Sequence, residues 1–232
     1  MESVTKIPFF KEISGDLETP LSIYLKFMDD RNSYLFESVE GGEKWARYSI
    51  IGLPTDKKID LSKNPLKDIE NFLKQNKSQP MPDLPDFHGG LVGYFSYETI
   101  RHIEKKLQNS SKEKLPYPDI SLMVSDEVVI YDNLKKSLFI VVHGNEDTKK
   151  ECHERIELIH KKILEPLPSQ KSSKKGVINF ESSVKKEDYL EAIKKIKNYI
   201  VEGDVMQVVY GQEFSTKFEG SPIDLYLSLI HI

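Results

Sequence analysis

The fold is decided by two stretches close together in the chain, Tyr34-Leu35-Phe36-Glu37-Ser38 and Arg47-Tyr48-Ser49-Ile50-Ile51-Gly52. Each is an apolar run typical of a strand, expected over residues 34–39 and 45–51, and the glycines between them are typical of a turn. The pattern predicts an antiparallel pair. Its adjacent ends would carry a carboxylate, a guanidinium and hydroxyls, which together can hold an amino acid by its ammonium and its carboxylate.

The same residues have a simpler interpretation. Glu37 at the end of one strand and Arg47 at the start of the next could form an ordinary ion pair. Such pairs are common in proteins, whereas binding sites are few. From these residues alone, both interpretations stay open.

Further elements follow from caps and periodicity. Helices are predicted after Thr19-Pro20 and Asn64-Pro65, because a polar cap followed by proline is a helix start. A third helix buries one face, and a fourth is capped by Ser183 and ends before Gly203. The buried face of the third consists of Cys152, Ile156, Ile159 and Ile163. Further strands are expected at 88–95, 138–142 and 205–218, residues 120–131 are expected to be rich in β structure, and a turn is expected at 132–137.

Runs of adjacent strands favour an α+β fold, with an antiparallel sheet and flanking helices, over a regular βαβ alternation. Residues 165–176 contain prolines, serines and lysines and are the best linker in the chain. We therefore expect a domain over 1–165, a linker over 166–178 and the start of a second domain over 179–232.

Composition excludes several classes of protein. The 232 residues carry a net charge of −4, whereas nucleic-acid binders usually show a basic excess. The single cysteine, Cys152, excludes an intramolecular disulfide and indicates a reducing compartment. The N-terminus lacks the basic and apolar regions of a signal peptide, and no apolar run approaches the ~18 residues of a membrane span. A soluble cytoplasmic protein is expected, with no membrane and no nucleic-acid partner.

Other motifs have structural explanations. Gly89-Gly90-Leu91-Val92-Gly93 is neither a dinucleotide-binding nor a P-loop pattern, so it predicts a strand against which another backbone packs closely. The six histidines show no metal-binding spacing. Cys152 lies on an apolar helix face and is expected to be a small buried hydrophobic residue.

Several motifs in one order resemble component I of anthranilate synthase, from about Pro8 to at least Tyr226. They are Leu35-Phe36-Glu37-Ser38, Arg47-Tyr48-Ser49-Ile50-Ile51-Gly52, Gly89 to Glu98 and Gly203 to Val209. The resemblance implies the aminase that converts chorismate and ammonia to anthranilate and pyruvate in L-tryptophan biosynthesis. It also implies Mg²⁺, a glutaminase partner subunit (component II) that delivers ammonia, and feedback inhibition by tryptophan bound to the N-terminal domain.

Carried over residue by residue, the resemblance implies a tryptophan site. Phe36 replaces the second leucine of the family motif, and Leu35, Phe36 and Tyr48 could form an apolar slot for an indole ring. The implied tryptophan-binding residues are Pro20, Glu37, Ser38, Arg47, Tyr48 and Ser49.

The resemblance also implies that the chorismate site, the carboxylates for Mg²⁺ and the catalytic histidine lie in a C-terminal part that this sequence does not contain. No catalytic or metal-binding residue is therefore assigned, and the chain is expected to be a fragment that is inactive alone. Glu213 stands where the family usually has arginine. Residues 227–232 match the translation of a transposon-end adapter used in sequencing libraries, so we hypothesise that they are not native.

Two alternatives stay open. One is the related aminobenzoate synthase component I of folate synthesis, which also uses chorismate. The other belongs to a different class: a non-catalytic module that binds tryptophan or docks a partner.

Overall fold

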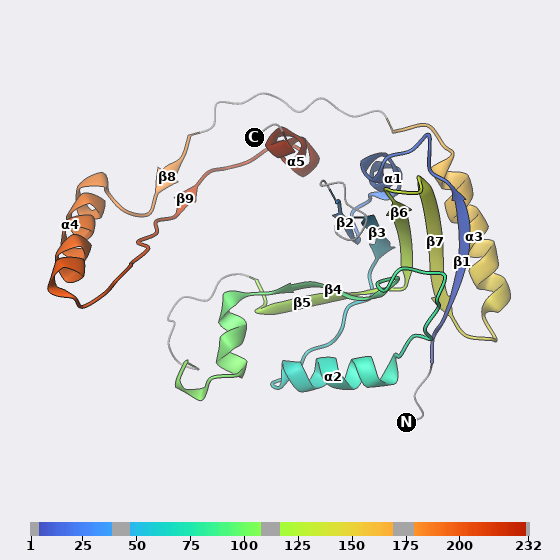
Figure 1. Cartoon of the computed structure of the whole chain (residues 1–232), viewed down its shortest axis with the longest axis horizontal. Coiled ribbons are helices and arrows are strands. Elements are labelled where there is room, and N and C mark those ends of the chain that lie inside the picture. The colour runs from blue at the N-terminus through green and yellow to red at the C-terminus, as the bar shows by residue number, and fades with distance from the viewer. Residues whose placement is uncertain (1–4, 39–46, 108–116, 169–178, 231–232) are drawn as a thin grey trace. The chain divides into compact units, whose positions relative to one another are not determined.

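The computed structural model describes residues 5–38, 47–107, 117–168 and 179–230 (Figure 1). The chain divides into two compact units, which we call unit 1 (Met1–Pro168) and unit 2 (Ser169–Ile232). Among the described residues, no helix is both long and apolar enough to cross a membrane.

Unit 1 is built on a five-stranded sheet in the order β1-β7-β6-β3-β2, in which every neighbouring pair is antiparallel. The predicted fold class is therefore confirmed. The expected turn between β2 and β3, residues 39–46, lies outside the described residues. The strands are β1 (Ile7–Ser14), β2 (Asn32–Phe36), β3 (Tyr48–Thr55), β6 (Glu127–Asp132) and β7 (Ser137–Gly144).

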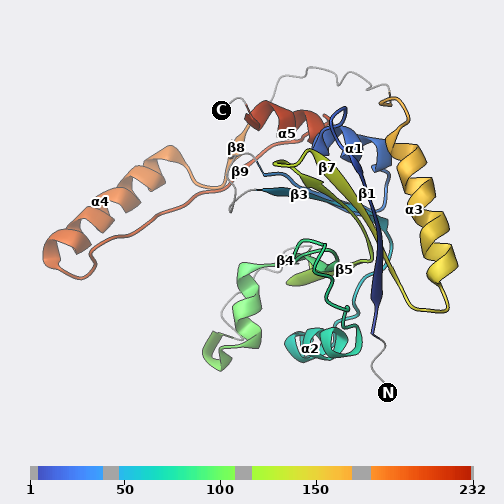
Figure 2. The ribbon, with the colours of Figure 1, turned by 45° about the vertical axis from the view of Figure 1, so that its right-hand side comes forward.

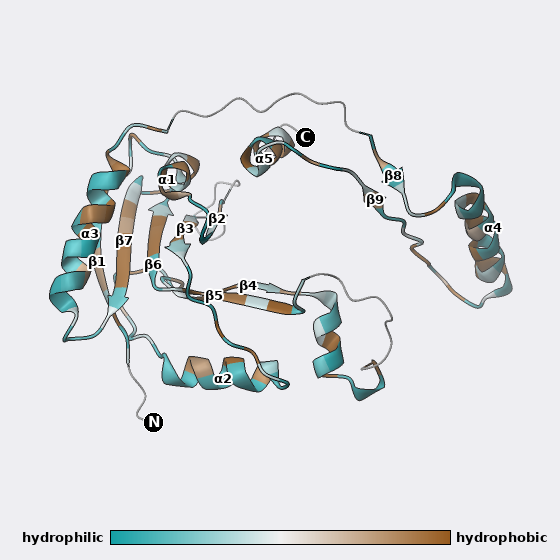
Figure 3. Ribbon diagram, turned by 180° about the vertical axis from the view of Figure 1, so that it is seen from behind, coloured by the Kyte–Doolittle hydropathy of each residue, from teal (hydrophilic) through white to brown (hydrophobic). Residues whose placement is uncertain are grey.

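Apolar clusters cover both faces of this sheet. Helices α1 (Pro20–Phe27) and α3 (Lys149–Ile163) pack on one face, and Figure 2 shows α3 lying along the sheet. On the other face, Leu84 packs with Phe139 and alternate residues of β6 and β7. Strands that are buried on both faces read as continuous apolar runs. Figure 3 accordingly shows β6 and β7 as largely hydrophobic, whereas hydrophobic and hydrophilic residues alternate along α3.

The helix predictions are confirmed in unit 1. Thr19 forms a capping box with Ser22 at the start of α1, which satisfies backbone N–H groups that the helix leaves unpaired. Helix α2 (Pro65–Gln75) also begins at its proline, but the Asn64 side chain makes no capping hydrogen bond. The predicted face of α3 is buried, Cys152 included.

A second sheet pairs β4 (Gly90–Phe95) with β5 (Ile120–Ser125), and the 3₁₀ helices η1 (Tyr97–His102) and η2 (Lys105–Leu107) follow β4. A Cβ at Gly93 would collide with the backbone carbonyl of Ser121, so the predicted close approach is confirmed. Residues 120–131 are rich in β structure, as predicted. Asp126 divides them into β5 and β6, which pair in different sheets.

Unit 2 contains β8 (Glu181–Ser182), α4 (Lys186–Glu202), β9 (Phe214–Ser215) and α5 (Pro222–Ile230). Gly203 ends α4 in the left-handed region, at φ 85°, as predicted. Lys185 occupies the N-cap position instead of Ser183, whose hydroxyl accepts from the Glu213 N–H. The long strand expected over 205–218 is reduced to β9, which pairs with the equally short β8.

Candidate functional site

The predicted site lies where β2 and β3 end. Their ladder closes at the Phe36–Ile50 pair, and Ser38 stands two residues beyond it. The Ser38 Oγ donates to the Tyr48 carbonyl at 2.7 Å, and the Ser38 N–H donates to the Ser49 Oγ at 3.0 Å. Because the hydroxyl proton of Ser38 is used in this way, its oxygen lone pairs remain available to accept from a ligand.

Ser49 differs from Ser38 in its exposure. Its exposed fraction is 0%, and its Oγ accepts from the Ser38 N–H and, at 3.1 Å, from the Asn133 Nδ2. Both partners can only donate, so the hydroxyl oxygen acts as acceptor in both bonds. Ser49 therefore holds the two strand ends together and presents no surface to a ligand.

Arg47 has a partner that the sequence interpretation did not foresee. Its Nε lies 3.0 and 3.1 Å from the two carboxylate oxygens of Asp132, and its Nη2 lies 2.5 Å from one of them. Burial acts to raise the pKa of Asp132, but hydrogen bonds from Arg47 and from the N–H groups of Lys135 and Leu134 outweigh it and hold the pKa below its ordinary value. The guanidinium is thus committed to Asp132.

The two faces of the sheet divide the predicted residues. Tyr48 pairs with Asp132 and packs in the cluster of Ile130 and Phe139, whereas Ser49 pairs with Tyr131, which lies in the cluster under α1. The Arg47 guanidinium lies 4.9 Å from the centre of the Tyr48 ring. Arg47 and Tyr48 line an open pocket of about 530 Å³, with Phe10, Leu84, Asp132 and Phe139 among its other lining residues.

Pro20 and Glu37 complete the predicted set. Pro20 is buried as the first residue of α1, and α1 packs against β2 and β3. Glu37 is partly buried directly after β2. The structure therefore brings Ser38 and Ser49 together at the strand ends, with Glu37 directly before Ser38, while Arg47 and Tyr48 line a pocket on the opposite face of the sheet.

Sequence reasoning missed Asp132 and Asn133. Both belong to the residues 132–137 that were predicted as a turn, and Asp and Asn are ordinary turn residues. The Asn133 Nδ2 reaches the Arg47 carbonyl at 3.0 Å as well as the Ser49 hydroxyl. The only sequence signal that could have pointed to these two residues is that they form a polar pair directly after a continuous apolar run.

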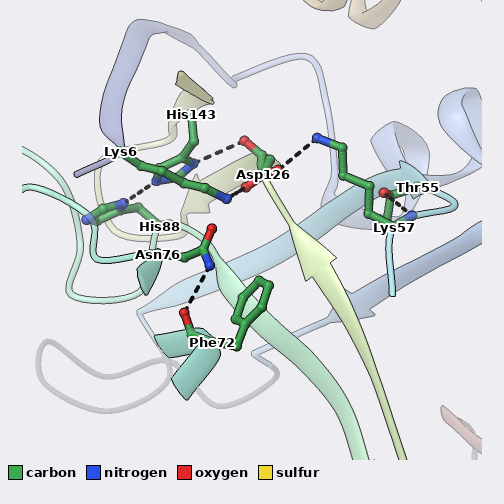
Figure 4. A network of polar contacts seen from close by, with 8 residues as sticks. All are labelled: Lys6, Thr55, Lys57, Phe72, Asn76, His88, Asp126 and His143. Carbon is green, nitrogen blue, oxygen red and sulfur yellow. Dashed lines mark hydrogen bonds and ion pairs between the residues drawn. The ribbon is translucent and has the colours of Figure 1, made fainter. Parts of the chain in front are cut away.

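A second polar cluster lies at the other end of β6 and β7 (Figure 4). The Nδ1 of His88 lies 3.1 Å from the Nε2 of His143, whose own Nδ1 lies 3.1 Å from the Asp126 carbonyl oxygen. The Asp126 carboxylate pairs with Lys6 at 2.5 Å and Lys57 at 3.0 Å. Burial lowers the pKa of both histidines. Among the described residues, no group of three or more His, Cys, Asp or Glu could hold a metal ion.

Three comparisons with known proteins agree with one another. The sequence model of a family described as chorismate binding enzyme matches residues 31–232. The chain is 38% identical over 251 residues to anthranilate synthase component 1 of Acinetobacter calcoaceticus, covering 97% of this chain and 50% of that protein. It is 40% identical over 256 residues to the Pseudomonas aeruginosa protein of the same name, covering 98% and 52%. The chain thus spans about half the length of the curated relatives it matches.

A solved structure supports the fold. Anthranilate synthase component I from Streptococcus pneumoniae TIGR4 matches with a TM-score of 0.65 and 20% sequence identity, over 94% of this chain and 51% of that one. At this identity the likeness concerns the fold alone.

Proposed function

The chain belongs to the chorismate-binding enzyme family, and from that premise we propose that it is part of the aminase of anthranilate synthase. This enzyme would convert chorismate and ammonia to anthranilate and pyruvate for L-tryptophan synthesis. The proposal is supported by relatives named anthranilate synthase component 1 that match along nearly the whole chain. Mg²⁺, a glutaminase partner and a cytoplasmic location belong to the same proposal. The described residues do not offer a metal site, so we assign no ligand to Mg²⁺.

We assign feedback control by tryptophan to unit 1. The observation that carries this is the geometry of Ser38, whose hydroxyl proton is given to the Tyr48 carbonyl, so that its oxygen can accept from an ammonium group. Glu37, the adjacent residue, supplies a carboxylate of the opposite charge to that ammonium. The start of the chorismate-binding domain would lie in unit 2.

Removing either polar group at the strand ends is expected to weaken tryptophan binding. A hydrogen bond to a charged group contributes ~1.5–3 kcal/mol, so Ser38→Ala or Glu37→Ala should raise the dissociation constant by about 10- to 100-fold. Isothermal titration of the whole chain with tryptophan measures this. Glu157→Ala, which removes only a carboxylate that pairs with Lys11 on the surface, is the matched control. If the unaltered chain binds no tryptophan at millimolar concentration, the proposed control site is wrong.

We expect no turnover of chorismate by the chain alone. No described residue of unit 2 is buried, whereas transition-state stabilisation depends on a site that excludes water. The measurement is anthranilate fluorescence after incubation with chorismate, ammonia and Mg²⁺. A rate of anthranilate formation above that of a protein-free blank would contradict the expectation.

The non-catalytic module is kept as a second candidate, because unit 1 has its own core and unit 2 has none among its described residues. Tryptophan binding by the chain agrees with both candidates. A measurement of inhibition distinguishes the two candidates. Only the enzyme proposal requires that tryptophan inhibit anthranilate formation when the catalytic part is present. Aminobenzoate synthase component I is less favoured, since the matched relatives carry the anthranilate synthase name.

A further inference from the structure

The turn between β6 and β7 is fixed by Asp132, the last residue of β6. The Asp132 carboxylate has an exposed fraction of 0%, and its Oδ1 accepts from the N–H groups of Leu134 at 3.0 Å and Lys135 at 3.1 Å. The same carboxylate holds Arg47, the residue directly before β3. One buried charge thus joins the turn to the start of β3.

Asn133, the next residue, makes a second connection between the turn and β3. Its backbone N–H donates to the Arg47 carbonyl at 2.9 Å, and its Nδ2 donates to the same carbonyl and to the Ser49 Oγ. The position of a serine oxygen depends on which of the staggered χ1 rotamers the side chain adopts, and a hydrogen-bond donor can favour one of them. The Asn133 amide therefore fixes where the Ser49 oxygen lies.

The position of Ser38 depends in turn on Ser49. Because the ladder of β2 and β3 ends at the Phe36–Ile50 pair, Ser38 is held to β3 by its hydrogen bonds to Ser49 and to the Tyr48 carbonyl. A continuous path of hydrogen bonds therefore runs from Asn133 through Ser49 to Ser38, across residues that are far apart in the sequence.

We propose that Asn133 is a positioning residue for the amino-acid site: through Ser49 it sets the orientation of Ser38, without touching the ligand itself. The inference rests on the proposed function, since Ser38 is the group that would accept from the ammonium of tryptophan. It assigns to Asn133 a role in affinity that neither its own chemistry nor its place in a turn would indicate.

The test compares Asn133→Ala with Leu134→Ala. Leu134 lies in the same turn and contributes its backbone N–H, while its side chain is 56% exposed, so Leu134→Ala is a matched control. We expect Asn133→Ala to raise the dissociation constant for tryptophan at least fivefold and Leu134→Ala to change it less than twofold. In the Ser38→Ala background, Asn133→Ala should have almost no further effect, because the residue it positions has lost its hydroxyl.

A measurement on the free chain separates this inference from the proposed function. By NMR hydrogen exchange, the Ser38 amide should exchange at least tenfold faster in Asn133→Ala than in the unaltered chain or in Leu134→Ala. Unchanged exchange at Ser38 would overturn the positioning role. If the unaltered chain binds tryptophan but Asn133→Ala binds it equally well, the inference fails and the proposed function stands. If the unaltered chain binds no tryptophan, the proposed function itself fails, whatever the exchange shows.

Discussion

Gly52→Val is expected to lower the free energy of unfolding by about 1–3 kcal/mol or more, the usual cost of overfilling a packed core. Gly52 lies opposite Tyr34 in the ladder of β2 and β3, and any Cβ there would fall within the Tyr34 ring. The ring is only 8% exposed and lies 4.9 Å from the Phe36 ring, and its hydroxyl bonds to the Ser125 Oγ at 2.9 Å. Burial raises the pKa of this hydroxyl to about 12.

The Tyr34 ring has little room to move, so a side chain at residue 52 must break its contacts. Urea denaturation of Gly52→Val, and of the milder Gly52→Ala, measures the loss. In a Tyr34→Ala background the conflict is absent, and Gly52→Ala should then cost less than about 0.5 kcal/mol. Gly211→Ala is a control, since nothing lies within 4 Å of its added Cβ. An equal cost of Gly52→Ala in both backgrounds would show that the ring is not the cause.

Local signals in the sequence were sufficient for most of unit 1. Thr19 before Pro20 predicts the start of α1, because the cap and the proline act on backbone groups within one turn. Local signals did not predict which strands pair with one another. Residues 120–131 are rich in β structure, as expected, but their two halves join different sheets on either side of Asp126, and no local pattern contains that information.

The candidate site shows the same limit. The spacing of the two motifs predicted that their strands are adjacent, and Ser38 does contact Ser49 and the Tyr48 carbonyl, because adjacent antiparallel strands place them there. The partner of Arg47 could not be predicted. Asp132 is distant in sequence, and it becomes the neighbour of Arg47 only because β3 pairs with β6. Asn133 escaped notice for the same reason.

Acidification from pH 7.5 to 5.5 is expected to destabilise unit 1 through His88 and His143. The Asp126 carbonyl can only accept, so the Nδ1 of His143 carries a proton and its Nε2 accepts from the Nδ1 of His88. The pair is thus neutral, with ring centres 5.3 Å apart and planes 12° apart. One added proton can bind the Nε2 of His88 and leave this hydrogen bond intact, but a second would place N–H against N–H.

Several charged groups surround the pair. Lys6 of the chain before β1 and Lys57 of the loop after β3 both bind Asp126, and Arg155 of α3 binds Glu127 of β6. Arg31 and Asp56 line a pocket with His143. The nearest carboxylate, Asp126, is already paired with two lysines, so it offers little compensation for a charged imidazole.

The direction of the change in stability with pH follows from which state of the chain binds more protons. Burial lowers the pKa of both histidines in the folded chain, so below about pH 6.5, where histidines of the unfolded chain become charged, the unfolded state binds more protons. Stability is therefore complete above that pH and falls as the pH drops towards the folded pKa values, by about 1.4 kcal/mol per pH unit for each extra proton.

Thermal unfolding at pH 7.5, 6.5 and 5.5 measures this loss of stability. His88→Phe can retain the stacking without a titrating group and should flatten the dependence, whereas His153→Gln on the exposed side of α3 should not. If the unaltered chain and His88→Phe lose stability in parallel, the acid sensitivity of unit 1 must come from other groups, because the only proton site removed would then make no difference.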